Sequence, residues 1–280
     1  MEEYKLPAGL DLTGKTAVVT AGGGVLMSEF AKALAACGAN VALIDLYMGG
    51  MEPVAEAIGD RAFAVTADCT SRESLLAARE KILARFGPCD ILVNGAGGNN
   101  PMATTDNETM TPDLPEGTKS FFDLTDAGLS KVFNLNILSV FLTTQVFAAD
   151  MVERGGNIIN ISSMNAFRPL TKIPAYSAAK AGVSNITQWL AVHFAPCGIR
   201  VNAIAPGFFV TKQNKDLLFT ADGTPTARTE KILAATPQKR FGKPSELIGT
   251  LLWLVNDEAS GFVTGTVIPV DGGFAAYSGV

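Results

Sequence analysis

This 280-residue sequence has little of what several protein classes require. It has no run rich in lysine or arginine, and its net charge of −5 argues against a nucleic-acid partner. Its apolar stretches are too short to predict a membrane span, and its start lacks the apolar segment of a signal peptide. The single histidine, His193, lies in a helical stretch without nearby ligand candidates, so no metal site is expected.

Cysteines are also few, and they are scattered without a Cys-x-x-Cys pair. The four are Cys37, Cys69, Cys89 and Cys197. We expect them to be small buried residues rather than disulfide partners or metal ligands. The sequence therefore predicts a soluble cytoplasmic protein whose partner is a small molecule.

What the sequence does have is apolar residues and glycine. Its 48% hydrophobic content and 28 glycines suit a buried parallel sheet with many tight turns. Its length fits one large α/β domain over residues 1–280.

Strand-like runs alternate with helical patterns along most of the chain. Strands are predicted at residues 16–20, 41–45, 62–66, 91–94, 157–161, 200–204 and 267–270. Helices are predicted at residues 25–36, 71–86, 127–153 (broken or bent), 175–195 and 245–255. This alternation predicts right-handed crossovers and a doubly wound parallel sheet, the Rossmann fold, with helices on both faces.

Two polar, irregular segments interrupt the alternation, at about residues 98–122 and 208–237. A short helix is predicted within the second, near residues 226–235. Both segments follow strand C-termini, the edge where ligands bind in open parallel sheets. We expect them to form a substrate lobe, and a solvated excursion is the alternative.

A glycine-rich turn between the first strand and the first helix predicts a nucleotide site. Gly22, Gly23 and Gly24 would let the backbone approach a pyrophosphate, and Val25 and Leu26 open the helix whose N-terminus favours negative charge. A tight turn without a ligand is the alternative.

The aspartate that ends the second strand indicates which dinucleotide binds. Asp45 would accept hydrogen bonds from ribose hydroxyls and repel a 2′-phosphate, and no lysine or arginine follows it immediately, which favours NAD over NADP. Further cofactor contacts are expected after the third and fourth strands, at Asp68, Cys69, Asn94, Gly95 and Ala96.

Ser163, Tyr176 and Lys180 have the spacing Ser-x12-Tyr-x3-Lys. Tyr176 and Lys180 would lie one turn apart on a helix, where a fixed ammonium group should lower the pKa of the phenol. Ser163 follows a buried strand and could hydrogen-bond a substrate oxygen while the tyrosine moves a proton. This chemistry suits hydride transfer to a nicotinamide, although a Tyr-x-x-x-Lys pair alone also occurs by chance.

In this order the motifs resemble those of the short-chain dehydrogenase/reductase family, over nearly the whole chain. The segment 94–97 resembles the family's Asn-Asn-Ala-Gly motif, with glycine second, and the segment 271–273 resembles its C-terminal sheet motif. The resemblance implies that Asn136 is a fourth catalytic residue, which holds a relay water near the lysine. It also implies cofactor contacts by Tyr176, Lys180, Pro206, Gly207, Phe209 and Thr211.

The glycine loop departs from the family pattern Thr-Gly-x-x-x-Gly-x-Gly. Ala21, Val25 and Met27 stand at the three defining glycines, so we expect the cofactor to sit slightly higher, approached by the glycines at 22–24. With the segments 97–101, 162–166 and 275–280, this loop resembles the D-mannonate oxidoreductase (fructuronate reductase) branch.

That branch implies an NAD-dependent oxidoreductase that interconverts D-mannonate and D-fructuronate, a sugar acid and its keto form. Arg168 is expected to bind the carboxylate through its planar fork, and a solvated surface arginine is the alternative. The other polar residues expected to face the substrate are Asn99, Asn165 and Lys212, with Asn100, Lys172 and Gln213 in the same segments.

Two other functions and one assembly remain open. The enzyme could be another sugar-acid or polyol dehydrogenase, such as a gluconate 5-dehydrogenase, or the chain could be a non-catalytic dinucleotide-binding protein. The family, with the apolar helices around residues 133–147 and 175–195, implies a homo-oligomer, either a tetramer or a dimer.

Overall fold

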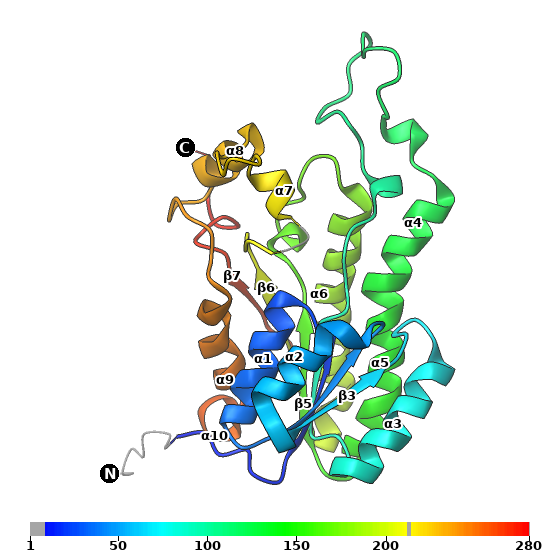
Figure 1. Ribbon diagram of the computed structural model, residues 1–280, viewed down its shortest axis with the longest axis vertical. Helices are drawn as coiled ribbons and strands as arrows, with labels where there is room; N and C mark the ends of the chain where they lie inside the picture. Colours follow the sequence, from blue (N-terminus) through cyan, green and yellow to red (C-terminus); the bar gives the residue numbers. More distant parts are fainter. Residues whose placement is uncertain (1–8, 212–213, 280) are drawn as a thin grey trace.

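The centre of the computed structural model, which describes residues 9–211 and 214–279, is a parallel β-sheet (Figure 1). Its strands are β1 (Thr16–Thr20), β2 (Asn40–Asp45), β3 (Ala62–Thr66), β4 (Ile91–Asn94), β5 (Gly156–Ile161), β6 (Ile199–Pro206) and β7 (Val267–Val270). They lie in the order β3-β2-β1-β4-β5-β6-β7, and every neighbouring pair is parallel. The order reverses between β1 and β4, which places a ligand-binding edge at the carboxyl ends of these strands. The predicted doubly wound fold is confirmed.

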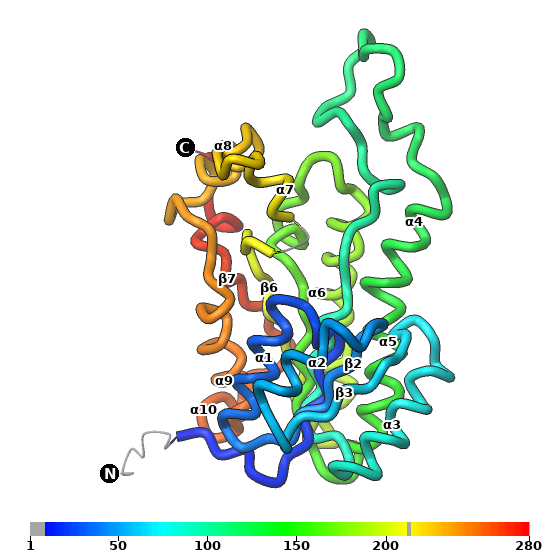
Figure 2. Tube along the Cα trace, viewed as in Figure 1, coloured from blue at the N-terminus to red at the C-terminus, as the bar shows by residue number. Residues whose placement is uncertain are grey.

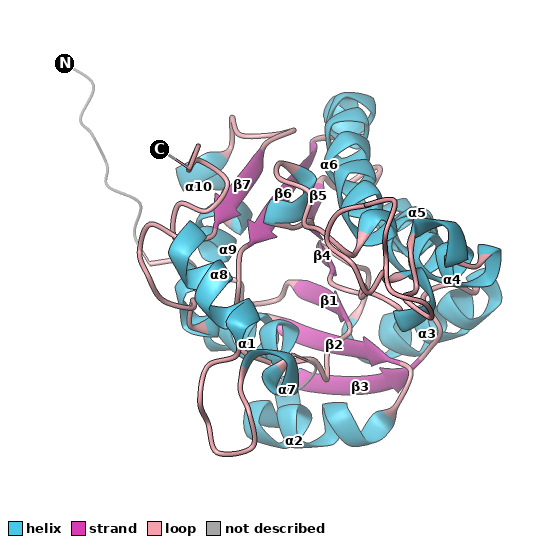
Figure 3. Ribbon diagram, turned by 90° about the horizontal axis from the view of Figure 1, so that it is seen from above, coloured by secondary structure: helices cyan, strands magenta, loops and turns pink. Residues whose placement is uncertain are grey.

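Helices cover both faces of the sheet, as the view from above shows (Figure 3). The main ones are α1 (Val25–Ala36), α2 (Met48–Ile58), α3 (Arg72–Phe86), α4 (Asp126–Phe133), α5 (Ser139–Phe147), α6 (Pro174–Phe194), α8 (Ala227–Ala235) and α9 (Ile248–Val255); α7 (Lys215–Leu218) and α10 (Asp257–Ser260) are short. One core cluster packs α1, α2 and α9 on one face, and a second packs α3, α5 and α6 on the other. Both faces are covered, so β1 and β6 are buried along their whole length.

The long helical segment Asp126–Met151 changes its winding twice. It joins α4 to α5 through a π-helical turn, η4 (Asn134–Leu138), and ends in a 3₁₀ turn, η5 (Ala148–Met151). The expected break in this helix is therefore confirmed. No stretch was expected to be long and apolar enough to cross a membrane. By length and composition alone this segment is, with a mean hydropathy of 1.5 over its apolar window. Half of that window is buried inside the protein.

Both irregular segments rise above the carboxyl edge of the sheet (Figure 2). The first contains only two 3₁₀ turns, η2 (Pro101–Ala103) and η3 (Phe121–Asp123), whereas the second contains α7 and the predicted helix α8. An ion pair joins them: Lys231 Nζ donates to Glu108 Oε1 at 2.9 Å, across 123 residues of sequence. The two segments therefore meet over this edge.

Candidate active site

The residues expected to be catalytic converge at the end of β5 and the first turns of α6. Ser163 follows β5, and its hydroxyl accepts a hydrogen bond from the Asn165 amide at 3.2 Å. Lys180 Nζ donates to the Ile161 carbonyl at 2.8 Å and lies 5.7 Å from the centre of the Tyr176 ring. The spacing recognised in the sequence therefore brings the three side chains to one place.

Burial controls the protonation of this group. The Lys180 side chain is almost inaccessible to solvent, and burial lowers its pKa from 10.5 to about 8. Burial also raises the pKa of Tyr176, and the Ser163 hydroxyl acts in the opposite direction. The expected lowering of the tyrosine pKa by Lys180 is therefore wrong for the protein alone. The ammonium group is directed at the Ile161 carbonyl, and loss of hydration dominates at the phenol.

Asn136 lies in the π-helical turn, and its side chain is fully buried. Its Oδ1 accepts from the Gly98 amide at 3.1 Å, and its Nδ2 donates to the Gly98 carbonyl and the Val132 carbonyl, each at 2.8 Å. A Cβ added at Gly97 would lie 2.7 Å from Asn136 Oδ1 and 2.9 Å from Lys180 Nζ. The Asn136 amide therefore holds the 97–98 backbone directly against the lysine.

The glycine loop and Asp45 form one hydrogen-bonded unit. The Gly23 amide donates to Asp45 Oδ2 at 3.1 Å, while Asp45 Oδ1 accepts from the Leu46 amide. A Cβ at Gly22 would lie 2.9 Å from Leu43 Cβ, and one at Gly23 would lie 2.7 Å from the Gly50 carbonyl carbon. These two glycines are thus required by packing within the chain, in addition to any role in approaching a cofactor.

The start of α1 fits an anionic group. Its N-cap residue, Gly24, supplies no side-chain hydrogen bond, and its first turn carries no acidic residue, so backbone N–H groups face the loop. Ala21, before this turn, has a left-handed φ of +56°, where the family pattern has glycine. With the Asp45 carboxylate one strand away, the donors and acceptors match a pyrophosphate and a ribose.

Side chains after β3 and β4 are used mainly by the protein itself. Asp68 Oδ1 accepts from the amide and the hydroxyl of Thr70. Burial raises the pKa of the Cys69 thiol to about 12, with smaller contributions from Asp68 and Asp45, so the thiol stays neutral. The Asn94 amide is buried in a network across β4, α5 and β5, with partners Thr143, Thr144 and Asn160.

The segment after β6 is anchored by packing. A Cβ at Gly207 would lie 2.6 Å from the Asp271 Cα, so only glycine fits there. Phe209 is buried and its ring packs on Gly242. The Thr211 amide donates to Asn214 Oδ1 at 2.8 Å. The Phe209 ring forms part of the core, so only its backbone is free to contact the cofactor as expected.

The residues expected at the substrate have different surroundings. Asn165 is buried beside Ser163, and its Oδ1 has no hydrogen-bond partner within residues 9–211 and 214–279. Arg168 is exposed, and its Nε donates to the Ala275 carbonyl at 3.2 Å. The side chains of Asn99 and Asn100 are used within their own loop. Lys212 and Gln213 lie outside the described residues.

Comparison with known proteins identifies the family. A family model described as enoyl-(acyl carrier protein) reductase matches residues 28–275. The chain belongs to the short-chain dehydrogenase/reductase family. An oxidoreductase of Haemophilus influenzae, whose function is not characterised, is 55% identical over 279 residues, which cover 98% of each chain. The 2-dehydro-3-deoxy-D-gluconate 5-dehydrogenase of Escherichia coli is 35% identical over 272 residues, which cover 95% of this chain and 97% of that one.

A solved structure links the family to its cofactor. The crystal structure of a Haemophilus influenzae protein, provisionally assigned as a D-mannonate oxidoreductase, contains bound NAD. Its TM-score to this chain is 0.93, at 55% identity, with 96% of this chain and 98% of that chain covered. This short-chain dehydrogenase/reductase is therefore an NAD(H)-dependent oxidoreductase that acts on a CH–OH group.

The sequence motifs of this dehydrogenase did not include the polar residues that join the end of β5 to α6 and so support the site. Ser162 Oγ donates to the Lys180 carbonyl at 3.1 Å and shares a hydrogen bond with Ser184 Oγ at 2.7 Å. Asn160 Nδ2 donates to Thr187 Oγ1 at 2.9 Å and ties β5 to α6. The only sequence signal was polar residues in an otherwise apolar buried strand.

Proposed function

We propose that this dehydrogenase interconverts D-mannonate and D-fructuronate. The observation that carries the proposal is the buried carbonyl of Asn165, two residues after Ser163, which is unpartnered within the described part of the chain. A buried acceptor without a donor is costly, and a polyhydroxylated substrate supplies a hydroxyl donor beside its reacting carbon. The provisional assignment of the Haemophilus influenzae structure supports the same substrate pair.

In the proposed mechanism the substrate oxygen lies between the hydroxyls of Ser163 and Tyr176. Bound NADH supplies the hydride to the carbonyl carbon. Tyr176 donates the proton to the oxygen, or accepts it in the oxidative direction. With the cofactor bound, Lys180, whose Nζ lies 5.7 Å from the centre of the Tyr176 ring, would stabilise the phenolate and bind the nicotinamide ribose. Asn136 keeps the 97–98 backbone against Lys180 and positions the relay water.

The cofactor contacts are part of this proposal. The start of α1, with the glycines at 22–24, would hold the pyrophosphate, and Asp45 would hold the adenosine ribose. Because the Asn94 amide is already used within the protein, its contribution would come from the backbone. The same reasoning applies to Phe209, whose ring is buried.

Cationic side chains above the carboxyl edge of the sheet would bind the carboxylate of the sugar acid. Arg168 remains the first candidate, because its Nε contact with Ala275 fixes a fork that suits a carboxylate. Positive charge also gathers where the two irregular segments meet. There Lys231 lowers the pKa of Glu108, and Lys172 and Arg228 add to the effect.

A direct test compares Tyr176→Phe with Tyr47→Phe. The first loses the proton donor and should reduce kcat for D-fructuronate by several orders of magnitude while NADH still binds. The second removes a hydroxyl from an exposed tyrosine at the start of α2 and should keep wild-type kcat. Near-normal turnover by Tyr176→Phe would refute the mechanism.

The substrate is tested by following NADH oxidation with D-fructuronate, 5-ketogluconate and neutral ketoses in parallel. The relative that acts at the 5-position of a deoxygluconate makes a gluconate 5-dehydrogenase the second candidate. Preference for D-fructuronate with loss of that preference in Asn165→Leu supports the proposal. Equal activity on neutral ketoses would exclude an acid-specific enzyme.

We further propose a cytoplasmic homo-oligomer, either a tetramer or a dimer. The four thiols, all within the described residues, are free, which suits a reducing compartment. Large apolar side chains are exposed on the long helical segment and on α6, namely Phe133, Leu138, Phe141, Trp189 and Val192. Trp189→Glu should lower the mass measured by light scattering; an unchanged mass would remove α6 from the interface.

A further inference from the structure

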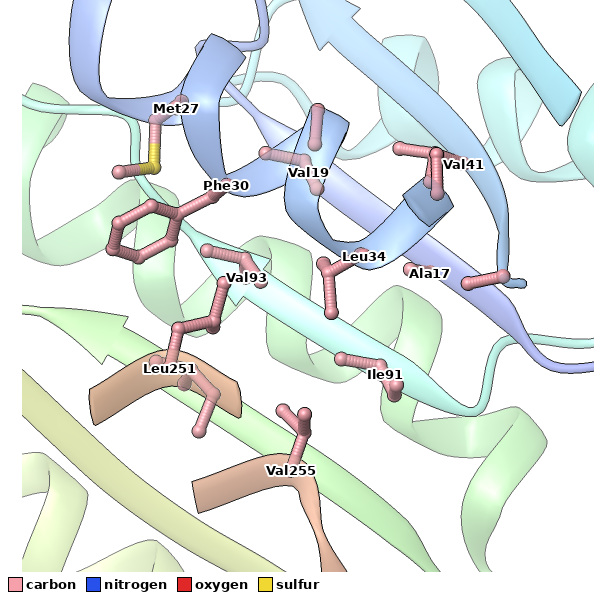
Figure 4. Close-up of a cluster of buried hydrophobic side chains, with 14 of the residues drawn as sticks. Ala17, Val19, Met27, Phe30, Leu34, Val41, Ile91, Val93, Leu251 and Val255 are labelled. Carbon is pink, nitrogen blue, oxygen red and sulfur yellow. The ribbon is translucent and has the colours of Figure 1, made fainter. Parts of the chain in front are cut away.

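The start of α1 and the end of β4 meet at two residues, Met27 and Gly95. Met27 is buried in the core cluster beside Phe30, as Figure 4 shows. A Cβ added at Gly95 would lie 2.5 Å from Met27 Cγ, closer still to its Sδ, and 2.7 Å from the Thr20 carbonyl oxygen. The Met27 side chain therefore fills the space that any side chain at position 95 would need.

This contact joins two departures from the family pattern that lie far apart along the sequence. The pattern has glycine at the position of Met27 and asparagine at the position of Gly95. Here the large residue stands on α1 and the glycine stands after β4. The absence of a side chain at Gly95 leaves the space that the Met27 side chain fills, so side-chain volume is moved from the end of β4 to the start of α1.

The glycine that Met27 contacts belongs to a segment that reaches the catalytic lysine. The Gly95 and Ala96 amides both donate to Thr20 Oγ1, at 2.9 and 3.1 Å. Gly97 follows and lies against Lys180 Nζ, as described above. One end of this short segment therefore packs on Met27, and its other end packs on the buried ammonium group.

We propose that Met27 is a positioning residue of the NAD site. Met27 stands at the position of the last glycine in the family pattern. Its side chain fixes the 95–97 backbone by contact with Gly95. Because α1 supplies the N–H groups for the pyrophosphate and the 95–97 backbone follows β4 on the other side, Met27 sets the separation of the two walls. A side chain at position 95 then requires a smaller residue 27 and a small shift of the Thr20 carbonyl.

The experiment is a double-mutant cycle with Gly95→Ala and Met27→Ala, read out by NADH fluorescence on binding and by thermal unfolding of the cofactor-free protein. Gly95→Ala should weaken NADH binding at least tenfold. In the Met27→Ala background the same change should weaken binding less than threefold. Full recovery is not expected, since the Thr20 carbonyl still lies 2.7 Å from the added Cβ.

Two variants serve as matched controls. Gly49→Ala adds a methyl group on α2, near the loop but with open space around it, and should leave NADH binding within twofold of wild type. Met51→Ala makes a cavity in the same core cluster without touching Gly95, so Gly95→Ala should be as damaging in that background as in wild type.

An equal loss on adding Gly95→Ala to Met27→Ala and to Met51→Ala would overturn the proposal, as would wild-type NADH binding by Gly95→Ala alone. If Gly95→Ala does not fold, the double variant decides. A folded Met27→Ala/Gly95→Ala protein supports the exchange, and an unfolded one beside a folded Met27→Ala protein refutes it. NADH binding needs no sugar substrate, so the result is independent of the substrate assignment.

Discussion

The buried ammonium group of Lys180 should make the stability of the cofactor-free protein depend on pH in a specific way. Its pKa falls from the ordinary lysine value of 10.5 to about 8 in the folded chain. That difference corresponds to about 3 kcal/mol against the charged form in the folded state. Below pH 8 the lysine is charged in both states, and the whole penalty is present.

Between pH 8 and 10.5 the unfolded chain holds this proton and the folded chain does not, so stability rises with pH in that window. Lys180→Met removes the titration. Urea unfolding at pH 7 to 9.5 should therefore show wild type gaining about 2 kcal/mol over Lys180→Met across the range. Lys81→Met, at an exposed position on α3, is the control and should follow wild type. Parallel curves for wild type and Lys180→Met would refute the reasoning.

Three further changes test separate features. Ala21→Gly relieves a left-handed φ of +56° and should stabilise the protein by about 0.5–1 kcal/mol in urea unfolding; destabilisation would contradict the strain. Asn94→Leu leaves its buried partners on α5 and β5 unpaired and should cost about 3 kcal/mol; wild-type stability would show that the network contributes nothing. Glu108→Gln breaks an exposed ion pair with Lys231 and leaves that ammonium group free to attract the substrate carboxylate, so KM for the sugar acid should fall by up to about fivefold at low salt. Lys231→Gln should instead raise KM, and a fall in KM for that variant would argue against carboxylate binding there.

The strands were predictable because their apolar runs are short, buried on both faces and bounded by turn residues. The runs at residues 62–66 and 267–270 match β3 and β7 residue for residue, and β6 extends beyond its predicted end at residue 204. The helix α2 was missed, since its sequence contains Gly49, Gly50 and Pro53, which disfavour a helix locally. Burial of Met51 and Val54 against the sheet overrides those preferences.

The sequence predicted which residues come together in the candidate site, but not how deeply they are buried or what packs against them. The convergence of Ser163, Tyr176 and Lys180 follows from their spacing, because a strand end and a helix start fix their directions. The pKa of Tyr176 did not follow, since desolvation depends on the depth of the site. The contact of Met27 with Gly95 also needed the structure, because nothing in a single sequence relates two residues so far apart.

The π-helical turn at Asn134–Leu138 makes the spacing of residues along the long helix as important as their identity. An α-helix turns by about 100° per residue, so deleting one residue there would rotate everything before it relative to α5. Asn136 could then no longer face Gly98 while Thr143 still faces Asn94. The helix should therefore tolerate neither insertion nor deletion between Asn136 and Thr143, its two anchored side chains.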